Sequence, residues 1–219
     1  MGRLILIRHG ESECNATRCF ASSPDAVLTE RGRVQALDAA VRIGAEFRPS
    51  LVVASPYRRA HETARIIAEL LSLSVEVESE IREQQLGLLV GKPYESVRQF
   101  PDFDPLRSWL FRPPDGESQD DVRRRSGPAL DRLMLRFSDS DVVVVSHGGV
   151  MRALWAHVTG RWDDAQIPAN CGIVTIEHQN RRYTAAPLIA GDADPAWRAS
   201  LEPRRSIVEK IATGRILQA

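Results

Sequence analysis

The chain has 219 residues, of which 43% are apolar and 26% are charged. These proportions are those of a globular protein and exclude a disordered or fibrous chain. The 29 basic and 29 acidic side chains cancel. We therefore expect no nucleic-acid partner, because binding a phosphate backbone requires a surplus of basic residues.

No apolar run approaches the roughly 18 residues that a membrane helix needs, so no membrane partner is expected. The apolar stretch within the first ten residues is also too short for a secretory signal. The three cysteines, Cys14, Cys19 and Cys171, are odd in number and lack metal-type spacing. A reduced, cytoplasmic compartment is the simplest interpretation.

In chain order, strand-like and helix-like segments alternate. Strands are predicted at 3–7, 51–54, 75–77 and 141–145, with a closing pair at 172–177 and 182–186. Helices are predicted after an N-cap at Thr29, over about 58–71, after a cap at Ser118 or Asp120, and over about 149–158. The Gly127-Pro128 pair is expected to bend the third of these helices.

This alternation predicts an α/β fold, a three-layer sandwich with a mostly parallel central sheet and helices on both faces. We expect a single domain over 1–219. One stretch, at about 92–118, has weak periodicity and many prolines and aromatic residues, and it is predicted to be an inserted lid or substrate loop. A C-terminal extension at about 188–219 contains a short amphipathic stretch whose role the sequence leaves open.

Ligands of parallel sheets bind outside the carboxyl ends of the strands. Arg8 and His9 follow the first strand, Arg58 follows the second, and His147 follows the strand at 141–145, with Gly148 and Gly149 next. Arginine forks match phosphate oxygens, and glycines at the start of a helix let backbone N–H groups approach an anion. These strand ends therefore predict a site for a phosphoryl group.

The motifs around these residues resemble those of the histidine phosphatase superfamily, which includes the cofactor-dependent phosphoglycerate mutases. The resemblance extends in family order over residues 3–175. Its blocks are LILIRHGES (4–12), LTERGRVQA (28–36), SPYRRAHETA (55–64), IREQQLGLLVGK (81–92), PDGES (114–118) and VVSHGGVMRAL (144–154).

The resemblance implies a role for each matching residue. His9 is the expected nucleophile that becomes phosphohistidine. The expected phosphoryl-binding groups are Arg8, Arg58 and His147, assisted by Asn15 and Gly148. Neither a metal nor a cofactor is expected. Neighbouring arginines suit this chemistry, because they keep the nucleophilic imidazole neutral and hold the phosphoryl oxygens.

The resemblance also implies a general acid. The resemblance points to Glu83, which is followed by Leu86-Gly87 and Gly91, and leaves Glu80 as the fallback. A carboxylic acid here would protonate the leaving oxygen and then activate water.

Three functions follow from these residues. The favoured one is a metal-independent phosphatase that hydrolyses phosphorylated small molecules. The alternative is a phosphoglycerate mutase-type phosphotransferase. The mutases, however, carry a longer insertion rich in arginine and lysine between the acid and the second histidine, whereas the equivalent stretch of this chain is short and aromatic and contains one lysine, Lys92. A non-catalytic binding module is disfavoured by the intact set of chemical groups. A homodimer is possible.

The 92–118 stretch has two possible roles. Its arginines, Arg98, Arg107 and Arg112, could bind a second anionic group while its aromatic residues pack against the substrate. Alternatively, the aromatic residues only anchor the stretch to the core.

Overall fold

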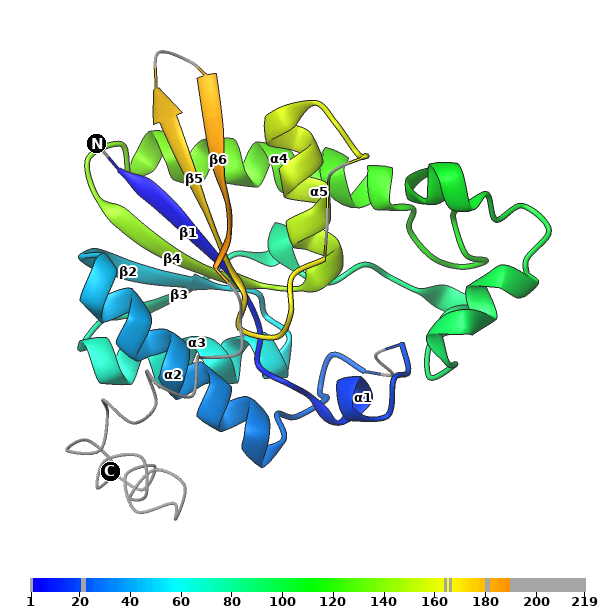
Figure 1. The fold of residues 1–219 in the computed structure, drawn as a ribbon, viewed down its shortest axis with the longest axis horizontal. Helices are drawn as coiled ribbons and strands as arrows, with labels where there is room; N and C mark the ends of the chain where they lie inside the picture. Colours follow the sequence, from blue (N-terminus) through cyan, green and yellow to red (C-terminus); the bar gives the residue numbers. More distant parts are fainter. Residues whose placement is uncertain (1, 21–22, 164, 166, 180–181, 190–219) are drawn as a thin grey trace.

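The computed structural model describes residues 2–20, 23–163, 165, 167–179 and 182–189, and its strands form a six-stranded sheet (Figure 1). The sheet order is β3-β2-β4-β1-β5-β6. The strands are β1 (Arg3–Arg8), β2 (Pro49–Ala54), β3 (Val75–Val77), β4 (Asp141–Ser146), β5 (Ile173–Gln179) and β6 (Arg182–Ile189). The first four are parallel, and β5 and β6 close the sheet as an antiparallel pair. The predicted α/β class and mostly parallel sheet are confirmed.

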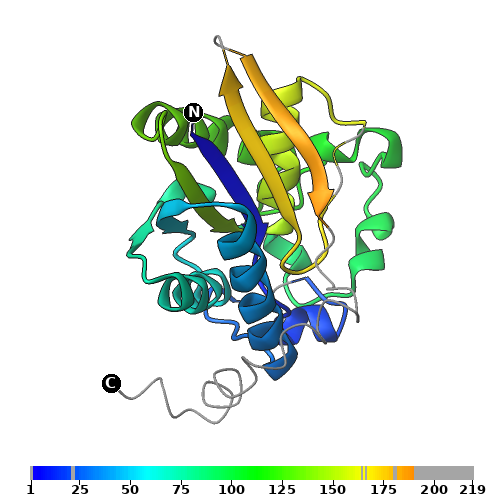
Figure 2. The same ribbon diagram turned by 60° about the vertical axis from the view of Figure 1, so that its left-hand side comes forward.

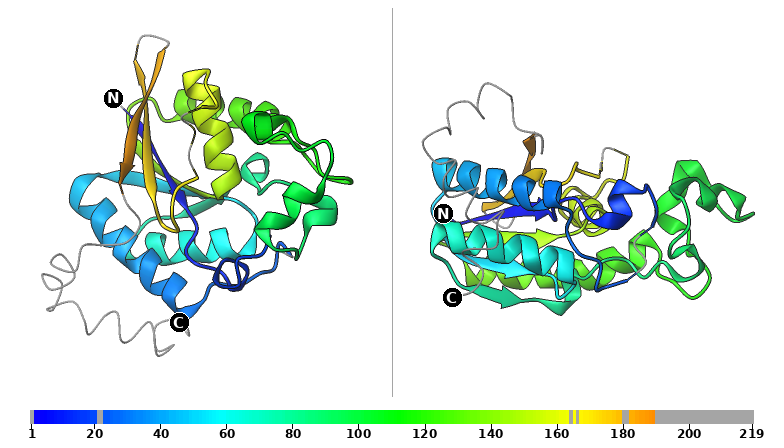
Figure 3. Two further views of the ribbon diagram at one scale, coloured as in Figure 1. Left: turned by 45° about the vertical axis from the view of Figure 1, so that its right-hand side comes forward. Right: turned by 90° about the horizontal axis from the view of Figure 1, so that it is seen from below.

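Helices cover both faces of the sheet (Figures 2 and 3). One face carries α2 (Glu30–Glu46) and α3 (Arg58–Leu71), and the other carries α4 (Gln119–Arg136) and α5 (Gly148–Thr159). The short α1 (Glu13–Ala16) follows β1. The predicted caps form as expected: the Thr29 hydroxyl accepts the Gly32 N–H at 3.0 Å, and Ser118 forms a capping box with Asp121. α4 continues through Pro128 as one helix.

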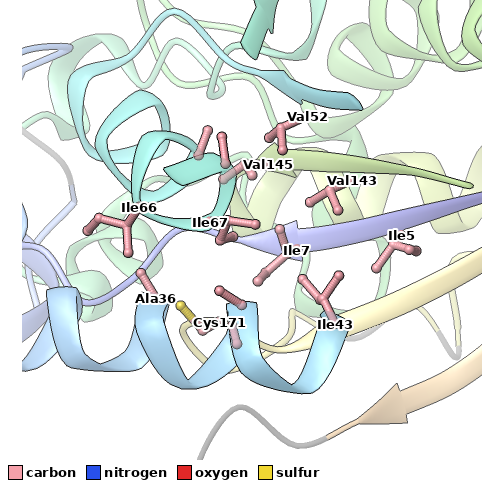
Figure 4. Packing of buried hydrophobic residues seen from close by; sticks show 14 of the residues in the cluster. Ile5, Ile7, Ala36, Ile43, Val52, Ile66, Ile67, Val143, Val145 and Cys171 are labelled. Carbon is pink, nitrogen blue, oxygen red and sulfur yellow. The ribbon is translucent and has the colours of Figure 1, made fainter. Parts of the chain in front are cut away.

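Successive side chains of a strand point to opposite faces of the sheet, so a separate core forms on each face. In β1, Ile5 and Ile7 face α2 and α3, whereas Leu4 and Leu6 face α4 and α5. Figure 4 shows the first core, where Ile5 and Ile7 pack with Ile43 of α2 and Val143 of β4. With both faces buried, the central strands are apolar throughout, which explains runs such as the valines of β4.

The predicted excursion projects beyond the carboxyl edge of the sheet (green, right-hand side of Figure 1). It is built mainly from 3₁₀ turns, η3 (Tyr94–Gln99) and η4 (Pro105–Leu110), and it follows two shorter ones, η1 (Ser79–Ile81) and η2 (Gly87–Leu89). These short turns have no long-range periodicity, so the sequence could not reveal them.

The two ends of the excursion are hydrogen-bonded to each other. Leu88 N donates to Pro114 O at 3.1 Å, and Glu117 N donates to Gln85 O at 2.7 Å. Gly87, at φ +50°, lies so close to Pro114 O that a Cβ atom would collide with it. The excursion is thus a loop with a closed neck.

Most of the predicted C-terminal extension, residues 190–219, lies outside the described residues. Within the described part of the chain, no helix combines the length and apolar character needed to cross a membrane.

Burial in the first core should contribute strongly to the stability of the fold. Ile5 is 0% exposed, and its truncation in I5A removes buried contacts and leaves a cavity. We expect the free energy of unfolding to fall by about 2–5 kcal/mol, measured by chemical denaturation. The control is V77A on the edge strand β3, where the side chain is 56% exposed and the loss should stay small. Equal losses in the two variants would contradict this account of the core.

Candidate active site

The parallel register brings the carboxyl ends of three strands into line. Arg8 pairs with Ser146 between β1 and β4, and Ala54 pairs with Val145 between β2 and β4. The next residue of each strand, His9, Ser55 or His147, therefore lies at the same edge. His9 is 2% exposed and His147 is 0% exposed, and their ring centroids are 5.2 Å apart.

His9 is held as a neutral imidazole with a defined tautomer. Its Nδ1 lies 2.7 Å from the carbonyl oxygen of Gly10, so Nδ1 carries the proton and donates it. Its Nε2 then has a lone pair, which accepts the Arg59 Nε–H at 3.2 Å. Burial, together with the charges of Arg59 and Arg8, lowers the pKa of His9 well below its usual value. The ring is therefore an unprotonated nucleophile at neutral pH.

The arginine beside His9 is Arg59, and the expectation of Arg58 was wrong. Arg59 is 1% exposed, lines the cavity and also donates from Nη1 to Ser23 O at 3.2 Å. Arg58 begins α3 with an exposed side chain.

Helical geometry explains the difference. Successive residues of a helix point about 100° apart. Arg58 shares its stripe with Glu62, Arg65 and Glu69, all charged, whereas Arg59 shares its stripe with the buried Thr63. This contrast is visible in the sequence and identifies the inward-facing arginine.

Arg8 and His147 each present a buried atom without a hydrogen-bond partner among the described residues. These atoms are Arg8 Nε and His147 Nδ1. Arg8 is otherwise fixed by its Nη1 bond to Pro168 O at 2.7 Å. His147 Nε2 lies 2.7 Å from the hydroxyl of Ser55, and burial lowers the pKa of this histidine. The unpaired Arg8 N–H is a donor, and His147 Nδ1 is a second donor in the tautomer whose Nε2 accepts from Ser55 Oγ; such an arrangement suits a ligand with several acceptor oxygens.

Glu83 lies beside the two histidines. Its Oε2 is 3.8 Å from His147 Nδ1, and its Oε1 accepts the Gln84 N–H at 2.9 Å. A Cβ atom on Gly149 would approach Glu83 Oε1 to 2.8 Å, so glycine is what lets this carboxyl group lie against α5. Burial raises the pKa of Glu83 above its usual value, although the charges of Arg59 and Arg8 oppose the rise.

Glu80, the fallback acid, lies elsewhere. Its carboxylate is 3.5 Å from Arg82 Nη1, and it does not line the cavity. Of the two glutamates, Glu83 is therefore placed to act on a bound molecule.

Asn15 and Gly148 complete the phosphoryl end of the cavity. The Asn15 carbonyl oxygen accepts from Ser12 Oγ at 3.0 Å and from Asn170 Nδ2 at 3.2 Å, which leaves its amide group directed to Tyr94 at 3.4 Å. A Cβ atom on Gly148 would lie 2.5 Å from Ile167 and 3.4 Å from Arg8 Nε. Gly148 thus allows the start of α5 to approach the Arg8 guanidinium.

The cavity has a volume of about 410 Å³, which is larger than a phosphoryl group requires. Beyond the polar end its wall is mainly apolar. This wall includes Phe20, Leu89, Tyr94, Phe103, Phe111 and Pro113. Other aromatic residues of the excursion anchor it instead, as Trp109 does by stacking on Trp162 with centroids 5.8 Å apart and planes 2° apart. Aromatic residues of the excursion therefore occur both in the cavity wall and among its anchoring contacts, and packing against a substrate stays a prediction.

Sequence reasoning missed several polar residues of the site. Asn170 Nδ2 donates to His9 O at 3.0 Å, and Ser55 supports His147. Gln119 is 8% exposed and lines the cavity, and its Oε1 accepts no hydrogen bond within the described structure. No quoted motif contains Asn170 or Gln119, and Ser55 stands in the block SPYRRAHETA without a role that the motif reveals, because each acts through a contact between segments distant in sequence.

The arrangement can hold a tetrahedral oxyanion. Arg8 and Arg59 supply positive charge, and Glu83 supplies a carboxyl group. His9 supplies a nucleophile, and His147 supplies a further polar group. In the described ranges, no cluster of three or more His, Cys, Asp or Glu residues forms a candidate metal site. Cys171 packs in the first core, where burial raises the pKa of its thiol to about 12.

The comparisons with known proteins agree on one family. A model described as the histidine phosphatase superfamily (branch 1) matches residues 4–188. The chain is 33% identical over 162 residues to a metal-independent phosphoserine phosphatase of Arabidopsis thaliana, covering 71% of this chain and 68% of the relative. It is 30% identical over 204 residues to a probable phosphoglycerate mutase of Erwinia tasmaniensis, covering 88% and 94%.

The similarity extends to solved structures. A mycobacterial glucosyl-3-phosphoglycerate phosphatase matches with a TM-score of 0.77 at 29% identity, and the match covers 86% of this chain and 99% of that chain.

The two neighbouring arginines offer a matched test of the site. In R59A the cavity loses a charged donor, so we expect affinity for inorganic phosphate to fall about 10- to 100-fold, measured by isothermal titration calorimetry. R58A removes an exposed arginine one position away and should leave affinity within about twofold. A larger loss in R58A than in R59A would overturn the assignment.

Proposed function

Since the chain belongs to the histidine phosphatase superfamily, as its motifs predicted, we propose that it hydrolyses phosphomonoesters of small molecules through a phosphohistidine on His9. The observation that carries this proposal is the state of His9: a neutral ring whose Nε2 lone pair accepts from Arg59, with the charge of Arg8 also lowering its pKa. The assignment to phosphoric monoester hydrolases agrees with relatives that are named as phosphatases.

In the first step, His9 Nε2 attacks the phosphorus atom and the bond from phosphorus to the ester oxygen breaks. Glu83, whose acid form burial favours by raising its pKa, gives its proton to the departing alkoxide. Arg59, which donates to Nε2 in the free protein, turns to the phosphoryl oxygens, since charge-assisted bonds to phosphate are stronger than a bond to neutral imidazole. Arg8 and His147 Nδ1 supply the further donors.

In the second step, water attacks the phosphohistidine. Glu83, now a carboxylate, takes a proton from the water while the Nε2–phosphorus bond breaks and its electron pair returns to His9. Phosphate and the original neutral histidine result. The Gly10 carbonyl, which accepts from Nδ1, stabilises the positive charge on the ring while the phosphoryl group is attached.

The alternative is a mutase, in which a hydroxyl group of a phosphorylated acid takes the phosphoryl group from His9. One relative is a probable phosphoglycerate mutase. The cavity favours hydrolysis, because its lining beyond the phosphoryl end, within the described residues, is mainly aromatic and aliphatic and has one arginine, Arg152, in place of the several cations that would hold a bisphosphorylated intermediate.

His9 gives the direct test of the proposal. We expect H9A to release phosphate from a panel of phosphomonoesters at a rate at least about 10³-fold lower than the wild type. The variant should also form no acid-labile phosphoprotein with labelled substrate. H61A, which changes a histidine of α3 outside the cavity lining, serves as the control and should retain activity. Fully active H9A would overturn the mechanism, and isomerised 3-phosphoglycerate without phosphate release would favour the mutase.

Glu83 should control the pH dependence. We expect E83Q to lower kcat on an alkyl phosphate by about 10²–10⁴-fold, with E80Q within a few-fold of wild type. With 4-nitrophenyl phosphate, whose alcohol leaves without a proton, E83Q should form phosphohistidine and accumulate it. In the wild type, the rate of phosphorylation by the alkyl ester should fall as pH rises through the raised pKa of Glu83, since only the acid form donates a proton. An unchanged pH profile in E83Q would contradict this role.

A further inference from the structure

A third arginine, Arg152, lines the cavity away from the reacting groups. It is on α5 with Gly148, four residues later, and both line the cavity, so they share one face of the helix. Four residues span about 6 Å along a helix. The Arg152 backbone is thus about one turn farther from the phosphoryl end of the site.

Among the residues that the structure describes, no acidic side chain compensates the charge of Arg152. No carboxylate of the described residues lies within salt-bridge distance of its half-buried guanidinium, and burial lowers its pKa with no acid acting to raise it. The arginines that the sequence suggested as anion ligands differ: Arg107 pairs with Asp104 and Arg112 with Asp121, and both are exposed outside the cavity. A partly desolvated cation without a counter-charge is costly unless a ligand supplies one.

Arg152 is also held in place. Its Nε donates to Ala165 O at 3.2 Å and its Nη2 to Ser108 Oγ at 3.3 Å, and its guanidinium lies 5.6 Å from the centroid of the Trp162 ring. Trp162 in turn stacks on Trp109 of the excursion. Two of the five N–H groups of the guanidinium are used in these bonds, so three can donate to a bound molecule.

Building on the proposed phosphatase function, we propose that Arg152 binds a second anionic group, a carboxylate or a phosphate, carried by the alcohol part of the substrate. The body of the substrate lies between the two anions, against Tyr94, Phe103 and Phe111 of the apolar wall. The substrate class is therefore a phosphomonoester with an apolar or ring-bearing body and a negative charge at its far end.

The test uses substrates that differ only in the distal charge. For 4-carboxyphenyl phosphate against 4-carbamoylphenyl phosphate, we expect the wild type to prefer the carboxylate about 10- to 100-fold in kcat/KM, expressed mainly in KM. In R152Q this ratio should fall to near one, and R152K should restore part of it. Benzene-1,4-diyl bisphosphate distinguishes a phosphate-binding subsite from one selective for carboxylate. The matched control is R107Q, which changes an exposed arginine of the excursion and should keep the wild-type ratio.

Binding of non-hydrolysable analogues separates this inference from the proposed function. The dissociation constants of 4-carboxybenzylphosphonate and 4-carbamoylbenzylphosphonate, measured by calorimetry, should show the same preference in the wild type and its loss in R152Q. A wild type that binds both analogues equally, or an R152Q variant that weakens both by the same factor, overturns the role of Arg152. A selective wild type that releases no phosphate from any ester supports the subsite and contradicts the phosphatase.

Discussion

The parallel register of β1, β2 and β4 is the constraint on which the site depends. Because Arg8 is opposite Ser146 and Ala54 is opposite Val145, the chain leaves three strands at one level, and His9, Ser55 and His147 meet there. A shift of one residue in any of these strands would turn the following side chain to the opposite face of the sheet. The two apolar cores prevent such a shift, since each strand buries side chains on both sides.

Within that frame, burial acts in opposite directions on two kinds of group. It lowers the pKa of His9 and raises the pKa of Glu83, so in both groups it favours the uncharged form. The arginines add to the first effect and oppose the second. A neutral nucleophile and a neutral acid in one desolvated place suit a reaction that moves a dianionic group, because neither residue adds to the charge that the site must hold.

Much of this could be predicted from the sequence, because the relevant signals are local. The strands have continuous apolar runs, the caps at Thr29 and Ser118 are short motifs, and the residues after β1 and β4 follow directly in the chain. The choice of Arg58 failed for a physical reason. Adjacent residues of a helix face different directions, and the two arginines can be told apart only by the residues that share a helix face with each of them.

Other features depend on contacts that no local pattern records. Asn170 reaches His9 across 161 positions of sequence, and Arg152 becomes distinctive only through the absence of a carboxylate near it in the described structure. The 3₁₀ turns of the excursion are too short to have a period. The sequence therefore indicated which histidines meet at the ends of β1 and β4, and it indicated little about the apolar wall of the cavity.

The closed neck of the excursion has a consequence for how the enzyme can diversify. Gln85 and Glu117, together with Leu88 and Pro114, join the two ends of the loop before it leaves the body of the protein. The segment between them can change in length and composition while its roots stay at the same separation, and the strands behind it need not move. Substitutions within this segment therefore alter the apolar wall of the cavity first and the ends of the central strands least.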